Sequence, residues 1–466
     1  SEKDEDIFNY IPPQQTNQIF TPKKVVKMMV DLLEEHDPHI FKNKESTFID
    51  LYSKSGLYLS EIAKRLFSGL AEQIPDEKER IKWILERQVF GCAPSNIIYN
   101  MVKNFLYGGY PEVKSDNLLE LDLVEAAKAG KVAETLEESM GRKMKFDVII
   151  GNQPYQLQTS SGSSQATPIY QEFVSSGISL DPEYLSMIIP SRWFAGGMGL
   201  DEFRKSMLQD RHLRYLVDFA NAKDCFPDNS ISGGVNYFLR DRDNPGDCEF
   251  TNIINNSVSK MTRDLSEFPV MIRYNEAVEI LRRTDYSQNL SEIVSSLTPF
   301  GLSTNFRGSS IQENENFYPV QTSVGISYIS KELITKGHEY LGKYKVLMSK
   351  TSAEHAGEPD RDGMYKVFTS SVRVMEPNEL CTHSYLLIGK FDEKRKAENL
   401  LSYLKTRYVR FLVLLSMSSI NVSKGIFKFV PIQDFSKPWT DEELYKKYNL
   451  DDEEIAFIES MIRPMD

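Results

Sequence analysis

The stretch Phe146-Asp-Val-Ile-Ile-Gly-Asn-Gln-Pro-Tyr-Gln156 decides the fold predicted for this chain. Val148–Ile150 is a short β-branched run closed by Gly151 and a polar turn, which is the pattern of a buried parallel strand. In open α/β sheets, ligands bind just outside the carboxyl ends of such strands. We therefore expect a ligand site at the four residues that follow the strand: Asn152, Gln153, Pro154 and Tyr155.

This turn has the groups needed to activate an aromatic amine. The exocyclic amine of adenine is a weak nucleophile because its lone pair is delocalised into the ring, and two acceptors on its N–H groups would localise that pair. The Asn152 side-chain oxygen and the Gln153 main-chain carbonyl supply two acceptors, and Pro154 favours an extended Gln153. Tyr155 can stack on a base that has left its duplex. The alternative is an ordinary turn at the end of a strand, which these four residues alone do not exclude.

Length and composition limit the class of protein. A chain of 466 residues is long for one domain, and we expect two or three. It is 41% hydrophobic and 26% charged, as globular proteins are, and no apolar run approaches the roughly 20 residues needed to cross a bilayer. With only six histidines, and with no metal-ligand spacing between the cysteines, we expect no metal site and a reducing cytoplasm. The cysteines are Cys92, Cys225, Cys248 and Cys381.

The formal net charge of −12 is unevenly spread along the chain. Residues 301–440 hold 19 Lys and Arg against 14 Asp and Glu, a net charge of +5, and the remainder carries −17. A locally basic module on an acidic body can bind a phosphate backbone. Random variation in composition is the alternative explanation.

Short strands alternate with helices over the first half of the chain. Phe48–Asp50, a loop ending at Gly56 and a helix over 57–67 form the opening unit of a nucleotide-binding α/β fold. Upstream, Thr21 is expected to cap a helix that starts at Pro22. The pattern predicts a doubly wound α/β sheet. Its further strands are expected near residues 88–91, 112–116, 184–189, 214–219 and 234–239.

In its order of parts, the chain resembles the adenine-specific DNA methyltransferases of restriction–modification systems, in the subgroup whose cofactor motifs precede the target-recognition domain. Asn17–Pro22 is similar to the family's leading Phe-Thr-Pro segment, and Asp50–Gly56 occupies the place of its Asp-Pro-Ala-Cys-Gly-Ser-Gly loop. Asn152–Tyr155 resembles the family's Asn-Pro-Pro-Tyr motif, and Cys225–Pro227 resembles the place of an aromatic residue that stacks on the other face of the flipped base.

The resemblance implies direct methyl transfer from S-adenosylmethionine to the exocyclic amine of a flipped adenine. Asn152, Gln153, Pro154 and Tyr155 would be catalytic, and Tyr155 and Phe226 would enclose the base. No metal is implied. The expected cofactor-binding residues are Phe20, Thr21, Pro22, Asp50, Tyr52, Ser53, Lys54, Gly56, Ser95, Asp116 and Asn152.

The resemblance also predicts the organisation of the whole chain. A Rossmann-like methyltransferase domain over 1–245 would be followed by a connecting helical segment over 246–296, a mixed α+β target-recognition domain over 297–439 and a helical tail over 440–466. The implied partners are double-stranded DNA and a nuclease or specificity chain, in a bacterial cytoplasm and in a restriction–modification or phage-defence system. Candidate DNA contacts are Arg307, Lys345, Lys350, Arg361, Lys366, Arg373, Lys424 and Lys428.

Three positions depart from the family pattern. Gln153 stands where the family has Pro, Lys54 stands where its loop has Gly, and Ala93 stands near the place of an acidic residue that binds the ribose. These departures favour an alternative: a weakly active or inactive methyltransferase-like subunit for DNA recognition or assembly. Two further alternatives remain, a protein glutamine methyltransferase, which the long trailing domain disfavours, and a fragment of a combined methylase–nuclease.

Overall fold

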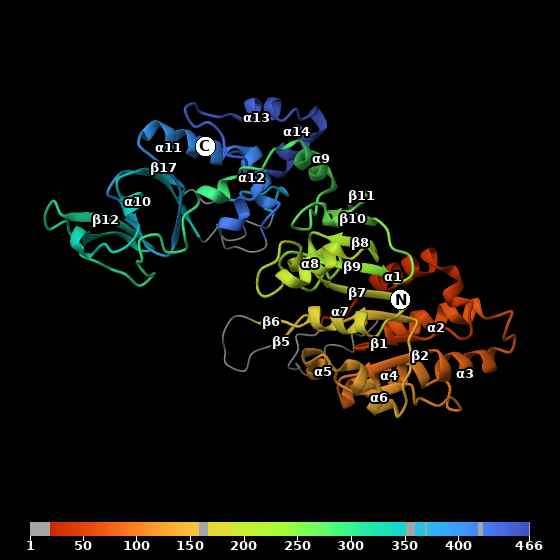
Figure 1. The fold of residues 1–466 in the computed structure, drawn as a ribbon. Helices are drawn as coiled ribbons and strands as arrows, with labels where there is room; N and C mark the ends of the chain where they lie inside the picture. Colours follow the sequence, from red (N-terminus) through yellow and green to blue (C-terminus); the bar gives the residue numbers. More distant parts are fainter. Residues whose placement is uncertain (1–18, 158–165, 351–358, 369–370, 418–422, 466) are drawn as a thin grey trace. The chain divides into compact units, whose positions relative to one another are not determined.

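The chain folds into two compact units, Ser1–Met271 and Ile272–Asp466. The computed structural model describes residues 19–157, 166–350, 359–368, 371–417 and 423–465 (Figure 1). The boundary lies beyond the expected end of the first domain at residue 245. The reason is that two more strands, β10 (Cys248–Ile254) and β11 (Ser257–Arg263), extend the sheet of the first unit.

The first unit is built on a nine-stranded sheet with the order β11-β10-β8-β9-β7-β4-β1-β2-β3. Its other strands are β1 (Phe48–Asp50), β2 (Val89–Ala93), β3 (Leu118–Glu120), β4 (Val148–Asn152), β7 (Tyr184–Pro190), β8 (Leu213–Phe219) and β9 (Val235–Asp241). β1 pairs in parallel with β2 and β4, whereas β9 is antiparallel to β7 and β8. The chain builds outward from β1 to β3 and then returns to β4, so the predicted doubly wound α/β fold is confirmed.

Helices cover both faces of this sheet. Consecutive strand residues such as Phe48 and Ile49 belong to two different buried clusters, as the alternation of side chains along a strand requires. One face is covered by α1 (Lys23–His36), α2 (Leu57–Gly69), α3 (Glu77–Arg87) and α4 (Asn96–Tyr107). The other is covered by α5 (Val124–Ala129), α6 (Val132–Met140), α7 (Tyr170–Ser179) and α8 (Asp201–Gln209). A small hairpin, β5 (Gln156–Leu157) and β6 (Thr167–Pro168), follows the turn 152–155.

The sheet changes its direction of growth between β1 and β4, which are adjacent. The loops that leave the carboxyl ends of these two strands diverge there and leave a place for a ligand. Both predicted motifs lie at this point, since Asp50 ends β1 and Asn152 ends β4. The topology therefore brings the loop 50–56 and the turn 152–155 to one site.

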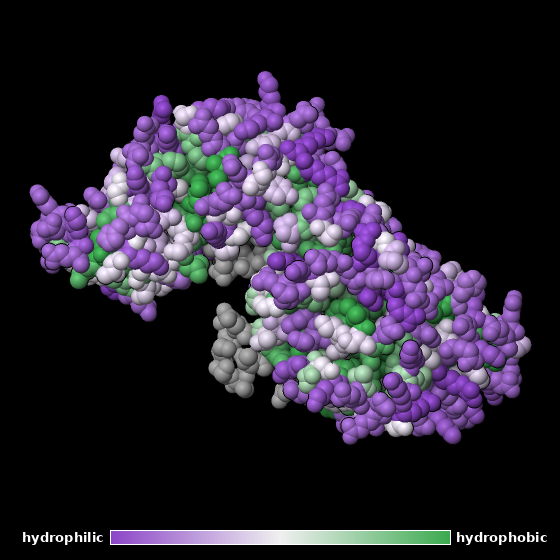
Figure 2. Space-filling model, in the orientation of Figure 1, coloured by the Kyte–Doolittle hydropathy of each residue, from purple (hydrophilic) through white to green (hydrophobic). Residues whose placement is uncertain are grey.

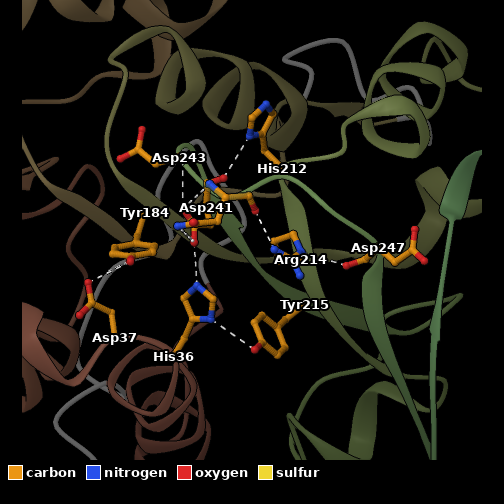
Figure 3. A network of polar contacts seen from close by, with 10 residues as sticks. His36, Asp37, Tyr184, His212, Arg214, Tyr215, Asp241, Asp243 and Asp247 are labelled. Atoms are coloured by element: carbon orange, nitrogen blue, oxygen red, sulfur yellow. Dashed lines mark hydrogen bonds and ion pairs between the residues drawn. The ribbon is translucent and has the colours of Figure 1, made fainter.

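Helix α1 is anchored at the opposite edge of the sheet by a polar network (Figure 3). His36 Nε2 lies 2.7 Å from Asp241 Oδ2, and His36 Nδ1 lies 3.3 Å from the Tyr215 hydroxyl. The Tyr184 hydroxyl donates to Asp37 Oδ2 at 2.9 Å. These contacts fix the end of α1 that is remote from the predicted site, and the segment before α1 lies at the site itself.

The second unit contains two three-stranded sheets, β13-β12-β16 and β15-β14-β17. Its strands are β12 (Phe317–Thr322), β13 (Gly325–Ser330), β14 (Tyr344–Ser349), β15 (Arg373–Met375), β16 (Leu380–Cys381) and β17 (Tyr385–Phe391). Its helices are α9 (Asn275–Arg283), α10 (His338–Leu341), α11 (Lys394–Lys405), α12 (Arg407–Leu414), α13 (Asp441–Lys447) and α14 (Asp452–Met461). The expected tail 440–466 is not separate, because α13 and α14 pack on α12.

The face of the molecule drawn in Figure 2 is mostly hydrophilic, with smaller hydrophobic areas between the polar side chains. Among the described residues, none of the helices has the length and apolar character needed to cross a membrane.

Two local predictions differ from the structure. The third strand is Leu118–Glu120 rather than 112–116, and residues 112–116 precede it in a turn region. Helix α1 starts at Lys23 with Pro22 at its N-cap, so Thr21 does not cap it. The Thr21 hydroxyl instead accepts a hydrogen bond from the Asn152 side chain, in the turn 152–155.

Candidate active site

The side-chain amide of Asn152 has a defined orientation. Its Nδ2 donates to the Ile19 carbonyl oxygen at 2.8 Å and to Thr21 Oγ1 at 2.9 Å. Both N–H groups are therefore used, and Oδ1 is buried without a hydrogen-bond partner of good geometry among the described residues. A buried acceptor without a partner is costly, and it is well suited to receive an N–H group from a ligand.

The residues around Gly151 are packed closely, and only glycine fits there. A Cβ atom at Gly151 would lie 2.5 Å from Asp50 Oδ1 and 3.0 Å from Gln153 Nε2. The Gln153 side chain is fully buried, and neither of its amide atoms has a partner within the described part of the chain. Gln153 therefore turns its side chain inward towards β1.

The two predicted base walls are buried at the same end of the sheet. Tyr155 is 6% exposed and Phe226 is 1% exposed. Burial raises the pKa of Tyr155 well above its usual value, Cys225 and Tyr58 raise it further, and a side-chain contact with Asn152 partly offsets these shifts. The loop that carries Phe226 thus adjoins the turn 152–155, but the Phe226 ring packs in the core with residues such as Val235 and Tyr237. Its contact with a base stays a prediction.

The last residue of β1, Asp50, carries a buried carboxyl, and the loop after β1 carries the buried amine of Lys54. Burial raises the pKa of Asp50 to about 7 and lowers that of Lys54 to about 7, and the two groups partly offset these shifts in one another. Lys54 Nζ donates to the Ile19 carbonyl oxygen at 2.9 Å. It also lies 5.8 Å from the ring centres of both Tyr52 and Tyr155. Lys54 therefore points into the site and does not extend into solvent.

The remaining cofactor predictions divide between the two edges of the sheet. Ser95 follows β2 at the carboxyl edge and caps α4 by accepting from the Ile98 amide at 3.3 Å. Asp116 precedes β3 and so lies at the amino edge, remote from Asn152. The carboxylate that follows β3 at the carboxyl edge is Asp122, which is exposed and accepts from the Val124 amide at 3.0 Å. The assignment of Asp116 to the cofactor is corrected accordingly.

Of the predicted DNA contacts, Lys345 is misplaced. It is fully buried in β14 and donates to the Tyr340 carbonyl at 3.1 Å and the Glu376 carbonyl at 3.3 Å. Burial lowers its pKa to about 8. Because DNA cannot reach a fully buried side chain, Lys345 is a structural residue.

The other seven basic residues keep some exposure. Arg373 lies 3.1 Å from Glu379, and Lys350 donates to the Leu297 carbonyl. Lys428 is half-buried. Those whose side chains are exposed are Arg307, Arg361, Lys366 and Lys424. Their contacts with DNA stay predictions.

In the described ranges, no group of three or more His, Cys, Asp or Glu side chains could hold a metal ion. The four cysteines are free thiols and are all buried, and burial raises their pKa values. A thiol held in its protonated form is a poor nucleophile. These cysteines therefore do not supply the chemistry of the site.

Comparison with known proteins identifies the class of the first unit. Residues 59–226 match the Eco57I restriction-modification methylase family. The chain is 28% identical over 292 residues to an uncharacterized adenine-specific methylase of Mycoplasma pneumoniae, covering 50% of this chain and 69% of that protein. Residues 59–226 are therefore similar to methylases of the restriction–modification type, and the predicted resemblance to the adenine-specific methyltransferases of these systems is confirmed. Within that class, the matching family is that of Eco57I.

Solved structures show the same fold over most of the chain. The DrdV–DNA complex matches with a TM-score of 0.51 and 13% identity, over 90% of this chain and 56% of that one. A nuclease-deletion mutant of the Type ISP restriction-modification enzyme LlaGI, in complex with a DNA substrate mimic, matches with a TM-score of 0.51 and 11% identity, over 83% and 44%. The chain spans about half the length of these proteins.

Proposed function

We propose that this chain is a site-specific DNA adenine methyltransferase that serves as the modification part of a restriction–modification system. It would transfer a methyl group from S-adenosylmethionine to the exocyclic amine of an adenine that has left its duplex. The observation that carries the proposal is the Asn152 amide, whose two N–H groups are engaged by Ile19 and Thr21 while Oδ1 is buried without a hydrogen-bond partner of good geometry among the described residues. An acceptor held in this way is complementary to an amine.

The chemistry follows from positioning and polarisation. Asn152 Oδ1 and the Gln153 carbonyl accept the two amine N–H groups, which localises the nitrogen lone pair. S-adenosylmethionine, when bound, would supply an activated methyl group to this nitrogen, and Asn152 Oδ1 and the Gln153 carbonyl would hold the amine, which would release a proton to water after the attack. No covalent enzyme intermediate and no strong base are required, because the proton leaves after the attack. Such preorganised acceptors act mainly by orientation and electrostatics.

The residues at the carboxyl edge fit S-adenosylmethionine, which supplies an activated methyl group when it is bound. The Ser53 hydroxyl is buried without a partner among the described residues, as is Asn152 Oδ1. Helix α2 begins at Leu57 after the N-cap Gly56, which has a positive φ of +79° and no side chain over the helix N-terminus, where an anion is stabilised. We assign the cofactor to the loop Asp50–Gly56 except Lys54, whose Nζ donates to Ile19, and to Ser95 and Asp122, with Phe20–Pro22 over it.

The second unit would recognise the DNA sequence. The solved relatives include proteins in complex with DNA, and the exposed basic residues Arg307, Arg361, Lys366 and Lys424 are suited to phosphate or base contacts. Tyr155 and Phe226 would replace the stacking of the flipped adenine. A nuclease or specificity chain is the partner expected for the assembled system.

An inactive DNA-recognition or assembly subunit is the second candidate. It is favoured by Lys54, which replaces a family glycine and fills part of the cofactor loop. The two candidates differ in cofactor binding. The inactive subunit would bind DNA without binding S-adenosylmethionine.

The test is product analysis. Purified chain is incubated with S-adenosylmethionine and long duplex DNA of varied sequence, and the DNA is digested to nucleosides for mass spectrometry. N6-methyladenine from the wild-type chain, absent with Asn152→Ala, is the expected result. Folded wild-type chain that binds DNA but neither binds the cofactor nor forms the product would favour the second candidate.

A further inference from the structure

We propose that Lys54 is a positioning residue that sets the orientation of the catalytic amide of Asn152 through the carbonyl group of Ile19. The inference rests on the proposed function for its catalytic consequence. Its structural part concerns only contacts within this chain. Lys54 is the residue at which the loop after β1 departs from the family pattern.

Lys54 and Asn152 share one acceptor. The Ile19 carbonyl oxygen receives Lys54 Nζ at 2.9 Å and Asn152 Nδ2 at 2.8 Å. A carbonyl oxygen has two lone pairs and accepts both bonds. The ammonium of the loop after β1 and the amide at the end of β4 are thereby joined through a residue that lies more than a hundred positions away from Asn152 in the sequence.

Lys54 has little freedom to leave this position. It is 6% exposed, and its ammonium lies 5.8 Å from the ring centres of Tyr52 and Tyr155, within the range of cation–π attraction. Asp50 is the charged group that acts on it electrostatically. These contacts hold the Lys54 ammonium towards Ile19. Lys54 therefore binds the peptide segment before α1 and does not bind the methionine carboxylate of a cofactor.

The consequence concerns which face of the amide meets the substrate. If the Ile19 carbonyl turned away, Asn152 would keep only Thr21 as an acceptor, and a rotation of the amide plane would become cheap. Rotation exchanges Oδ1 for Nδ2 at the substrate. Two N–H donors would then face one another and the adenine amine would not be activated. Lys54 therefore acts on the reaction through Ile19.

The experiment compares Lys54→Met with Lys64→Met, a matched change of an exposed lysine on α2. Three quantities are measured on the full chain: the single-turnover rate of DNA methylation, the dissociation constant of S-adenosylmethionine by calorimetry, and amide hydrogen exchange of the peptide 19–29 without cofactor. Because Lys54→Met leaves Asp50 buried without its counter-charge, the double variant Asp50→Asn/Lys54→Met is measured as well.

We expect Lys54→Met to slow methyl transfer about ten- to a hundredfold, the loss that follows from leaving one buried hydrogen-bonding group without its partner. In the same variant, the rate of amide hydrogen exchange in the peptide 19–29 should rise by about the same factor, and the dissociation constant of S-adenosylmethionine should stay within about threefold of wild type. Lys64→Met should match wild type in all three quantities. The double variant should show the same faster exchange.

Two results would overturn the inference. Unchanged exchange in 19–29, in either Lys54 variant, would show that Lys54 does not hold the segment. A loss confined to cofactor affinity would show that Lys54 binds the cofactor directly. If the wild-type chain does not methylate DNA, the proposed function fails, and the exchange measurement still decides whether Lys54 fixes Ile19.

Discussion

Thr21→Val tests whether the Asn152 amide is oriented by its two acceptors. Valine has nearly the shape of threonine and lacks the hydroxyl, so the substitution at this buried position removes the 2.9 Å bond from Asn152 Nδ2 and little packing. One buried N–H group then has no acceptor, which costs about 1–3 kcal/mol. Tyr58 also loses its 3.3 Å contact with Thr21, but its hydroxyl keeps Met29 Sδ at 3.2 Å.

The amide can avoid this cost by turning over, so that Nδ2 finds a partner in the substrate pocket. Catalytic activity falls with the fraction of molecules that have turned. A penalty of about 1.4–3 kcal/mol corresponds to a rate about 10- to 100-fold lower. The affinity for S-adenosylmethionine should change much less than the rate, because binding of this methyl donor does not depend on whether Oδ1 or Nδ2 of Asn152 faces the substrate.

The assay is single-turnover methylation of duplex DNA, with circular dichroism to establish folding. Thr21→Ser, which retains the hydroxyl, should stay within about threefold of wild type. Thr135→Val is a matched control, since the Thr135 hydroxyl donates to the Lys131 carbonyl at 2.7 Å within helix α6 and away from the site. A folded Thr21→Val variant with the wild-type rate would refute the reasoning.

Three further results are expected. Gly151→Ala should lower the free energy of unfolding by about 1–3 kcal/mol through overpacking, because the new Cβ would lie 2.5 Å from the buried Asp50 Oδ1. Gly109→Ala is the control, since no atom lies within 4 Å of the added Cβ, and it should change the free energy of unfolding little in urea titrations. Burial lowers the pKa of Lys54 from 10.5 to about 7, so between these pH values the unfolded chain binds more protons than the folded chain, and the free energy of unfolding should rise with pH. Lys54→Met should make this rise smaller in urea titrations at several pH values. An unchanged slope would contradict the lowered pKa. Asp122→Asn should weaken binding of S-adenosylmethionine about tenfold, whereas Asp116→Asn should not, and the reverse order would restore the original assignment.

The fold and the central motifs were predictable because their signals are local. The strand before Asn152, the loop after Phe48 and the closing antiparallel pair each occupy a few consecutive residues with a clear pattern. Their convergence follows from topology, since carboxyl ends of adjacent parallel strands share one edge of a sheet.

The errors concern contacts that no local pattern encodes. Thr21 has the sequence context of a helix cap, yet its hydroxyl serves Asn152, 131 residues away. Asp116 and Asp122 flank the same short strand, and a shift of a few residues in its position moves the expected carboxylate to the opposite edge. Lys345 has the charge of a DNA contact, but the pairing of β14 between β15 and β17 places it inside the unit.

The most direct test of the central claim is the single-turnover rate of adenine methylation by Asn152→Ala, measured together with its affinity for S-adenosylmethionine. We expect a rate lower by at least about a hundredfold, as for removal of one preorganised polar group that acts on the reacting centre, with a dissociation constant close to that of wild type. A folded variant that methylates adenine at the wild-type rate would rule out a catalytic role for Asn152.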